Sequence, residues 1–399
     1  MNAHASSVPS GDCLTFVHYI WRPGTEQREN ESRRIKDMMI IVGLAIAAAG
    51  ALVFNKLKIP AGIMIGALTF VAIFNITTGQ ADFPPYLKTM SQILTGTFIG
   101  MSIRGDVVRM LKTLIIPALA IVGCLMASGI AIGFLVYTIT DYDLVTCLLA
   151  TAPGGIVDMT LVGMDMGADT SVMAVFHLVR LVGVICIWPP LSRIILKRIY
   201  KTEITGKDDK EPADAAHKEK SDQAARPEKL DLKSLIKLNA LTIAVGAVGG
   251  IIGYLLKIPA GVLLFSMLAV GIMNIKTNRA YMSTSMRRLA QVVAGAMVGQ
   301  SFGMEQILSA GKMIMPAVVI ILCYLLVSVV LTFFLYKKSS LDLLSAIYSG
   351  IPAGASEMAL IAADMGADGP QVALLHMARI IFVIALYPQI VFVLVRLFT

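Results

Sequence analysis

The chain carries the stretch TAPGGIVDMTLVGMDMGAD at residues 151–169 and the related stretch GIPAGASEMALIAADMGAD at residues 350–368. Both contain a Pro and Gly break, then an acidic residue five positions after the Pro, and both end in DMGAD. The two stretches are 199 residues apart, and so are two copies of LKIPAG, at 57–62 and 256–261. Self-similarity at a fixed spacing indicates a duplicated structural unit.

The duplication keeps one register from residue 57 to residue 190. It predicts a first repeat at 38–200 and a second at 237–399. A poorly ordered tail (1–37) precedes them, and a charged linker (201–236), too polar to bury a core, joins them. Each repeat has six hydrophobic segments. We expect these segments near 38–54, 59–77, 86–103, 113–137, 143–163 and 170–196, and near 237–255, 258–275, 286–303, 312–336, 342–362 and 370–397.

The composition is that of a membrane protein. Hydrophobic residues make up 56% of the chain and charged residues only 15%, whereas soluble domains have about 25% charged residues. The mean hydropathy is +0.76, and runs of about 20 apolar residues are long enough to cross a bilayer as helix. We therefore expect an all-α polytopic membrane protein made of two tandem homologous repeats, each with a Pro/Gly-broken helix.

The basic residues predict how the repeats are oriented. Lys and Arg mark the cytoplasmic side of membrane segments, and here they precede the first segment and border the linker. The tail and the linker are therefore both expected to be cytoplasmic, which requires an even number of crossings and parallel repeats. We favour this arrangement. If the fifth segment instead dips in and returns, each repeat crosses five times and the repeats are inverted, as also occurs in transporters.

Charged and polar residues recur at equivalent places inside the hydrophobic segments. A charge at the bilayer centre costs roughly 2.5–3.5 kcal/mol on insertion scales, so such residues are paired or functional. Asp158 and Glu357 follow the Pro/Gly breaks and lie in the first turn of a half-helix, where free N–H groups and the helix dipole favour a carboxylate. They either satisfy their own helix ends or bind a coupling cation or proton beside a substrate. We favour the second interpretation.

The next helix of each repeat carries a His and an Arg three residues apart, which share one helix face. The pairs are His177 with Arg180, and His376 with Arg379. Each Arg is expected to pair with an acid, either as a structural clamp or as the counter-charge for an anionic substrate. Each His is either a hydrogen-bonded core residue, which we favour, or a proton relay.

The remaining candidates come from the breaks, two glycine stripes and the DMGAD turns. Gly154, Gly155 and Gly354 lie at the breaks and are expected at the substrate site. Gln92 and Gln291 each begin a Q-x-x-x-G-x-x-x-G stripe, which is typical of close helix packing, and their amides could reach a substrate. Asp169 and Asp368 look like structural N-caps of the next helix.

These motifs resemble one family. A duplicated unit with APGGIVDM (152–159), then DMGAD, then a helix that carries an Arg and ends at Pro resembles the AbrB-duplication family of bacterial inner-membrane proteins. Members are often labelled AbrB family transcriptional regulators or ammonia monooxygenases. The resemblance covers nearly the whole chain outside the tail and linker, although PAGASEM (352–358) departs from the pattern. It implies an inner-membrane location and an association with regulation of gene expression.

Three functions compete. A secondary transporter explains the duplication, the broken helices and the intramembrane charges together. A membrane sensor that affects gene expression indirectly is the alternative. A copper monooxygenase would need a His-rich cluster, and the chain has five His, of which only His177 and His376 lie in membrane segments. We expect no enzymatic activity, no cofactor, no metal and no direct nucleic-acid contact. The expected partners are the bilayer, a small substrate, and H⁺ or Na⁺; homo-oligomerisation is left open.

Overall fold

The computed structural model describes residues 25–57, 61–200, 232–304, 308, 310–339 and 341–398. Every regular element within these ranges is an α-helix. The first repeat contains α2 (Thr25–Lys56), α3 (Gly62–Thr78), α4 (Pro85–Met101), α5 (Gly105–Thr113), α6 (Ile115–Ile139), α7 (Leu144–Ala150), α8 (Ile156–Met166) and α9 (Thr170–Tyr200). The second contains α11 (Leu232–Leu255), α12 (Gly261–Thr277), α13 (Thr284–Gly299), α15 (Ala310–Lys338), α16 (Leu343–Ser349), α17 (Ala355–Asp364) and α18 (Gly369–Phe398).

The helices have the character of membrane segments. In the described residues, α2, α6, α9, α11, α15 and α18 each contain a stretch long and apolar enough to cross a membrane, and α3 and α12 are shorter apolar helices. Large apolar side chains face outward; Leu52 and Phe333, for example, are exposed. Such a surface is stable against lipid and not against water. The protein is therefore a polytopic α-helical membrane protein, as its composition predicts.

Several boundaries differ from the sequence expectation. Helix α2 begins at Thr25, so residues 25–37, expected to belong to a poorly ordered tail, are helical. Helix α5 was not predicted; its nine residues, GDVVRMLKT, mix charged and apolar side chains and so escape a search for long apolar runs. The rest of the expected tail (1–24) and most of the expected linker (201–231) lie outside the described residues.

The fifth hydrophobic segment of each repeat forms a hairpin that returns to its starting side. Thr146, in the first turn of α7, accepts a hydrogen bond on its hydroxyl oxygen from the backbone N–H of Asp169, which follows α8, at 2.8 Å. In the second repeat, Ser345 Oγ accepts from the N–H of Asp368 at 3.2 Å. The start of each first half-helix thus lies beside the end of the second. We call α7–α8 hairpin 1 and α16–α17 hairpin 2.

Equivalent helices of the two repeats run in opposite directions. Phe83, just before α4, donates its N–H to Oε1 of Gln300, just after α13, at 2.7 Å. At the other end, the carbonyl of Met101, the last residue of α4, accepts from Asn274 Nδ2 in the helix that precedes α13, at 2.6 Å. Helix α4 is therefore antiparallel to its equivalent α13, so the repeats are inverted and the favoured parallel arrangement is wrong.

The inversion follows from the hairpins. With the fifth segment returning to its starting side, each repeat follows the five-crossing alternative, and the next repeat starts on the opposite face. The placement of the tail and the linker on the cytoplasmic side remains a prediction, because most of their residues lie outside the described part of the chain. Counting charges could not detect the inversion, because the return of the hairpin depends on a tertiary contact.

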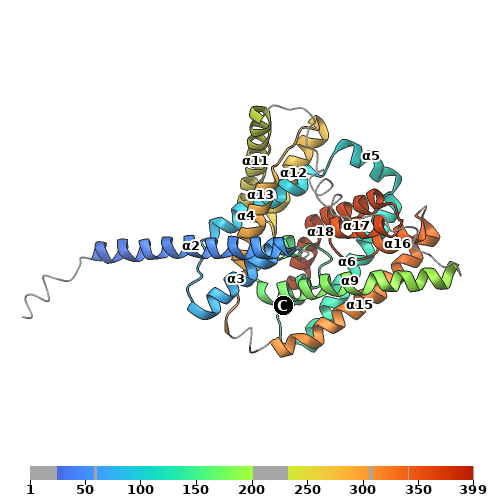
Figure 1. The fold of residues 1–399 in the computed structure, drawn as a ribbon, viewed down its shortest axis with the longest axis horizontal. Helices are drawn as coiled ribbons and strands as arrows, with labels where there is room; N and C mark the ends of the chain where they lie inside the picture. Colours follow the sequence, from blue (N-terminus) through green and yellow to red (C-terminus); the bar gives the residue numbers. More distant parts are fainter. Residues whose placement is uncertain are drawn as a thin grey trace, which may run out of the picture.

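The helices separate into two bundles (Figure 1). Helices α2, α3 and α4 of the first repeat pack with α11, α12 and α13 of the second, and we call this group the support bundle. Helices α6 and α9 with hairpin 1 pack against α15 and α18 with hairpin 2, and we call this group the hairpin bundle. Each bundle thus combines equivalent parts of both repeats.

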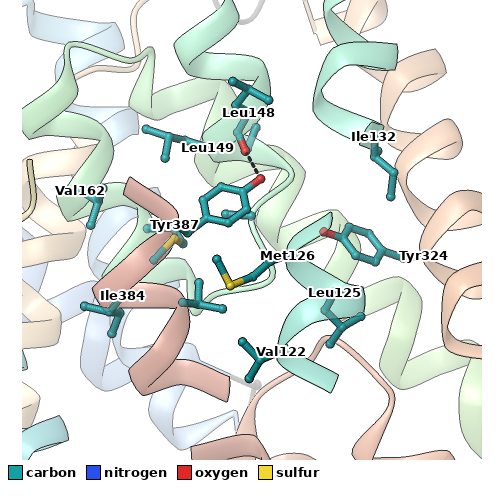
Figure 2. Close-up of a cluster of buried hydrophobic side chains, with 14 of the residues drawn as sticks. Val122, Leu125, Met126, Ile132, Leu148, Leu149, Val162, Tyr324, Ile384 and Tyr387 are labelled. Atoms are coloured by element: carbon teal, nitrogen blue, oxygen red, sulfur yellow. Dashed lines mark hydrogen bonds between the residues drawn. The ribbon is translucent and has the colours of Figure 1, made fainter. Parts of the chain in front are cut away.

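The hairpin bundle has a well-packed core in which the second repeat holds hairpin 1 (Figure 2). Tyr387 of α18 donates its hydroxyl hydrogen to the carbonyl of Leu148 in α7 at 3.0 Å. Tyr324 of α15 donates to the carbonyl of Thr151 at the break. Both rings are fully buried among side chains such as Leu125 and Ile384. The hydroxyl groups of α15 and α18 therefore hold hairpin 1 in place, in addition to apolar packing.

Two glycine stripes hold the support bundle together. A Cβ added to Gly96 would lie 2.4 Å from the carbonyl oxygen of Leu263 in α12, and one added to Gly100 would lie 2.4 Å from that of Met267. The equivalent stripe of α13 meets α3 in the same way at Gly295 and Gly299. These contacts are backbone to backbone, so a side chain cannot be admitted without separating the helices.

The stripe predicts a large difference between two Gly→Ala substitutions. We expect Gly96→Ala to lower the free energy of unfolding by about 2–3 kcal/mol, because the methyl group overpacks a backbone contact. Gly123, in α6, has no atom within 4 Å of an added Cβ, so Gly123→Ala should be neutral or slightly stabilising. Denaturation of the purified protein in mixed micelles measures both. Equal stability of the two variants would contradict the packing described here.

Candidate functional site

A cavity of about 200 Å³ lies between the two bundles where the two breaks meet. It is lined by Leu94, Thr95, Phe98, Ile99 and Ser102 of α4, by Arg287, Ala290 and Gln291 of α13, by residues 154–158 and 352–355 of the breaks, by His177, Arg180 and Leu181 of α9, by Met377, Arg379 and Ile380 of α18, and by Ala61. The cavity therefore draws on both repeats and both bundles. Most of the residues that the sequence singled out lie here.

The glycines of the first break leave room for other side chains. A Cβ on Gly155 would lie 2.6 Å from Oδ2 of Asp158, and a Cβ on Gly154 would lie 2.6 Å from Cγ of Met159. Gly155 is also the N-cap of α8, in extended conformation. The Asp158 carboxylate thus folds back toward the start of its own helix, where the dipole favours it. Gly354, the N-cap of α17, has the same place in the second break.

Asp158 is 9% exposed and lines the cavity. Arg287 of α13 also lines the cavity and supplies positive charge that acts on Asp158; its guanidinium lies over the ring of Phe98, 4.3 Å from the centroid. Arg287 was not among the residues predicted from the sequence. A signal existed, because a basic residue precedes the glutamine of each glycine stripe by one helical turn: Lys88 before Gln92, and Arg287 before Gln291.

Arg180 and Arg379 bind backbone carbonyls of the breaks. Arg180 donates from Nη1 to the carbonyl of Ala152 and from Nη2 to that of Gly154 at 2.7 Å. Arg379 donates to the carbonyls of Ile351 and Ala353 at 2.9 and 2.5 Å. We expected an acid as the partner, but the described contacts are carbonyls at the ends of the first half-helices. Those carbonyls lack helical partners, so each Arg satisfies the backbone that the break exposes.

The two histidines are fully buried beside these arginines. His376 Nε2 forms a hydrogen bond with the carbonyl of Tyr348 at 2.8 Å. The carbonyl of Leu149 has the equivalent place next to His177, but within the described residues neither ring nitrogen of His177 meets the geometry of a hydrogen bond. The carbonyl contact of His376 agrees with a core role, whereas His177 keeps unused hydrogen-bonding capacity at the cavity wall.

The two stripe glutamines lie in different surroundings. Gln291 lines the cavity. Gln92 instead donates to the carbonyl of Leu161 at 3.2 Å and to Oδ2 of Asp165 at 2.7 Å, and Lys88 Nζ lies 2.8 Å from the other oxygen of that carboxylate. These polar contacts join α4 of the support bundle to α8 of hairpin 1. Gln92 therefore acts as a contact between bundles and not as a wall of the cavity.

Four further acidic residues lie near the hairpins. Asp169 Oδ1 accepts from the N–H groups of Ser171 and Val172 at 3.0 and 3.2 Å, and Asp368 Oδ1 accepts from Gln371 N–H at 3.0 Å, which is the hydrogen bonding of an N-cap. The side chains of Glu357 and Asp364 lie outside the part that the structure describes. Among the described residues, no three His, Cys, Asp or Glu side chains are grouped to hold a metal ion.

The two hairpins contact the support bundle unequally. In hairpin 1, α8 packs against both α4 and α13. In hairpin 2, α17 packs against α16 and α18, and no packing of comparable extent on α4 or α13 is seen among the described residues. Among the described residues, the two hairpins thus differ in how they pack at the interface that contains the cavity.

The fold and cavity define a class: α-helical membrane proteins made of two inverted repeats around a central site. Within it, the chain belongs to the AbrB family, because the family described as "Transition state regulatory protein AbrB" matches residues 13–196 and again 204–395. "Uncharacterized protein YhjN" of Bacillus subtilis (strain 168) is 24% identical over 384 residues, covering 90% of this chain and 93% of the relative. "Putative regulator AbrB" of Escherichia coli (strain K12) is 21% identical over 339 residues, covering 84% and 91%. The resemblance seen in the sequence motifs is confirmed.

Proposed function

We propose that the protein is a secondary transporter of a small molecule in a bacterial inner membrane, and that the cavity at the two breaks is its substrate site. The observation that carries the proposal is the place of this cavity. It lies between inverted repeats and between two bundles, and broken half-helices line it. Inverted repeats, broken helices and a site at the repeat interface occur together in many transporters. We assign the protein no catalytic role.

Alternating access is the mechanism that we infer from the two bundles. Inverted repeats can exchange conformations, so one state implies a second state in which the two repeats have exchanged their conformations. The Lys88–Asp165 and Gln92–Asp165 contacts hold hairpin 1 on the support bundle in the described state. Movement of the hairpin bundle against the support bundle would expose the cavity to one side and then to the other. A proton or sodium ion at Asp158 would couple this movement to an ion gradient.

A flux measurement tests the proposal. Purified protein is reconstituted into proteoliposomes, and a panel of small organic acids and amines is offered to these vesicles. Substrate-dependent proton and sodium fluxes are recorded. We expect saturable flux for at least one class of solute, driven by an imposed ion gradient and absent from protein-free vesicles. Lack of flux for every class, by a protein whose thermal stability in the same vesicles is normal, would contradict transport.

A sensor is the second candidate. The names of the matching family and of the Escherichia coli relative contain the word regulator or regulatory. On this alternative, the cavity binds a signal, and the change between hairpin states is passed to a partner through residues 201–233. Capture of a partner on this segment, dependent on a cavity ligand and without flux, would favour the sensor.

A further inference from the structure

We propose that the cavity binds a small organic monocarboxylate with an apolar body. This inference rests on the proposed function, in that it takes the cavity to be the substrate site, and it names the chemical class of the substrate. It is carried by three independent features of the cavity wall: a pair of buried arginines, the N-termini of two half-helices, and an apolar lining.

The first feature is the pair Arg180 and Arg379. Their side chains are 4% and 1% exposed, and both line the cavity. Each guanidinium has five N–H donors, and the carbonyls of the breaks accept from the two Nη atoms only. Within the described part of the chain, these carbonyls are the hydrogen-bond acceptors of both guanidinium groups, and no carboxylate is paired with either. Two buried cations therefore line one space, and an anion there would compensate their charge.

The second feature is the backbone. Helices α8 and α17, of 11 and 10 residues, begin at the cavity wall. The first N–H groups of a helix have no acceptor within the helix, and the dipole makes that end positive. The N-cap residue of each helix is a glycine, which has no side chain that could accept a hydrogen bond from these N–H groups. Both half-helices therefore begin at the same space as the arginines, and the positive ends of their dipoles favour an anion there.

The charge balance favours an anion over a zwitterion. Among the described cavity residues, Asp158 is the one carboxylate, whereas Arg180, Arg287 and Arg379 supply three cations. The described cavity wall therefore carries more positive than negative charge. A ligand ammonium group would have to compete with Arg287 for Asp158, whereas a ligand carboxylate meets donors that are already in place.

The third feature is the rest of the wall. Leu94, Ile99, Ile156, Leu181 and Ile380 place apolar surface around the polar groups. A volume of about 200 Å³ is several times the ~30 Å³ share of one water molecule. An inorganic anion such as phosphate would leave the apolar wall unused and would keep costly uncompensated charge beside it. A carboxylate that carries a short hydrocarbon chain satisfies both parts of the site.

The test is calorimetric titration of the purified full-length protein in detergent with acetate, butanoate, hexanoate, butanamide, butylamine and phosphate. We expect binding of the carboxylates that strengthens from acetate to hexanoate, and at least tenfold weaker binding of the amide, the amine and phosphate. Equal or tighter binding of butylamine or butanamide than of butanoate would overturn the inference, and so would failure of all the carboxylates to bind.

A pair of neighbouring arginines supplies the matched variants, since Arg180 and Arg379 also hold the backbone and their loss could prevent folding. Arg287→Gln leaves Asp158 without its counter-charge in the cavity, so carboxylate binding should weaken at least tenfold. Arg288 is exposed on the same helix, and Arg288→Gln should bind within twofold of wild type. Similar affinities of the two variants would place carboxylate binding elsewhere and overturn the inference.

Transport and the carboxylate ligand class can be tested separately. Arg287-dependent carboxylate binding without flux of the bound acid in proteoliposomes would retain this ligand class and reject transport. Flux of an amine or a neutral solute, by a protein that binds no carboxylate, would retain transport and reject this ligand class.

Discussion

Oxidation of a Thr170→Cys/Ser301→Cys variant is expected to reduce substrate flux at least tenfold, and reductant is expected to restore it. Thr170 begins α9 in the hairpin bundle, and Ser301 follows α13 in the support bundle. The hydroxyl of Thr170 donates to Oγ of Ser301 at 3.1 Å. The two side chains are therefore in direct contact, which is the first requirement for a disulfide between these positions. The new bond would tie the bundles together in the observed state.

The reason for a large effect is that transport by alternating access needs this interface to open. A disulfide forbids relative movement, whereas the hydroxyl contact it replaces is weak and reversible. The experiment needs a background in which the five native cysteines are replaced. Flux in proteoliposomes is measured on one preparation before oxidation, after oxidation and after reduction, so that loss of folding is separated from locking.

A matched control lies inside one bundle. Thr140 Oγ1 and Cys147 Sγ are 3.8 Å apart, and both belong to the hairpin bundle. A Thr140→Cys variant that keeps Cys147 should form a disulfide on oxidation and retain flux within about twofold. If the pair between bundles transports at the same rate when locked, movement of one bundle against the other is not part of the cycle.

The sequence predicted the class, the duplication and most helices because these depend on local and repeated patterns. Long apolar runs define membrane helices by length alone, and a repeat at a constant offset needs no structure to be seen. Helix α5 was missed because a nine-residue amphipathic helix gives no such signal. The start of α2 was missed because a charged extension of a membrane helix resembles a polar tail.

The direction of the broken segments could not be read from the sequence. Helices α7 and α8 have 7 and 11 residues, which would span about 27 Å end to end at 1.5 Å per residue. That length suits a kinked crossing of a bilayer as well as it suits a hairpin. The deciding contact is the hydrogen bond between Thr146 and Asp169, which are 23 residues apart. The orientation of the second repeat depends on this single choice.

Only part of the candidate site could be predicted from the sequence, because its other part depends on tertiary contacts. Asp158, His177 and Arg180 stand out because charge is costly in an apolar segment. The partners of Arg180 did not, because a backbone carbonyl at a break has no side chain to mark it. The glutamines were treated alike since the repeats are alike in sequence, yet Gln92 bonds Asp165 whereas Gln291 lines the cavity.

Replacement of Asp158 by Asn is expected to abolish ion-driven uptake. Asp158 is the described acid of the cavity, it is 9% exposed, and it lies in the first turn of α8. Asn has nearly the same shape and can neither release a proton nor supply a full negative charge to a sodium ion. If Asp158 couples ion entry to movement, uptake driven by a proton or sodium gradient should fall at least tenfold.

Measurement of substrate exchange shows whether a loss of uptake comes from lost ion coupling or from misfolding. Counterflow of labelled against unlabelled substrate needs the cavity and the movement but no net ion transfer, so Asp158→Asn should retain it to a substantial degree. Asp169→Asn is the matched control, because Asp169 caps α9 through Ser171 and Val172 and does not line the cavity. Asn is as good an N-cap as Asp, so stability should change little and gradient-driven uptake should stay intact. Parallel loss of exchange and driven uptake in Asp158→Asn, at wild-type stability, would instead assign Asp158 to substrate binding and leave the coupling group to be sought elsewhere.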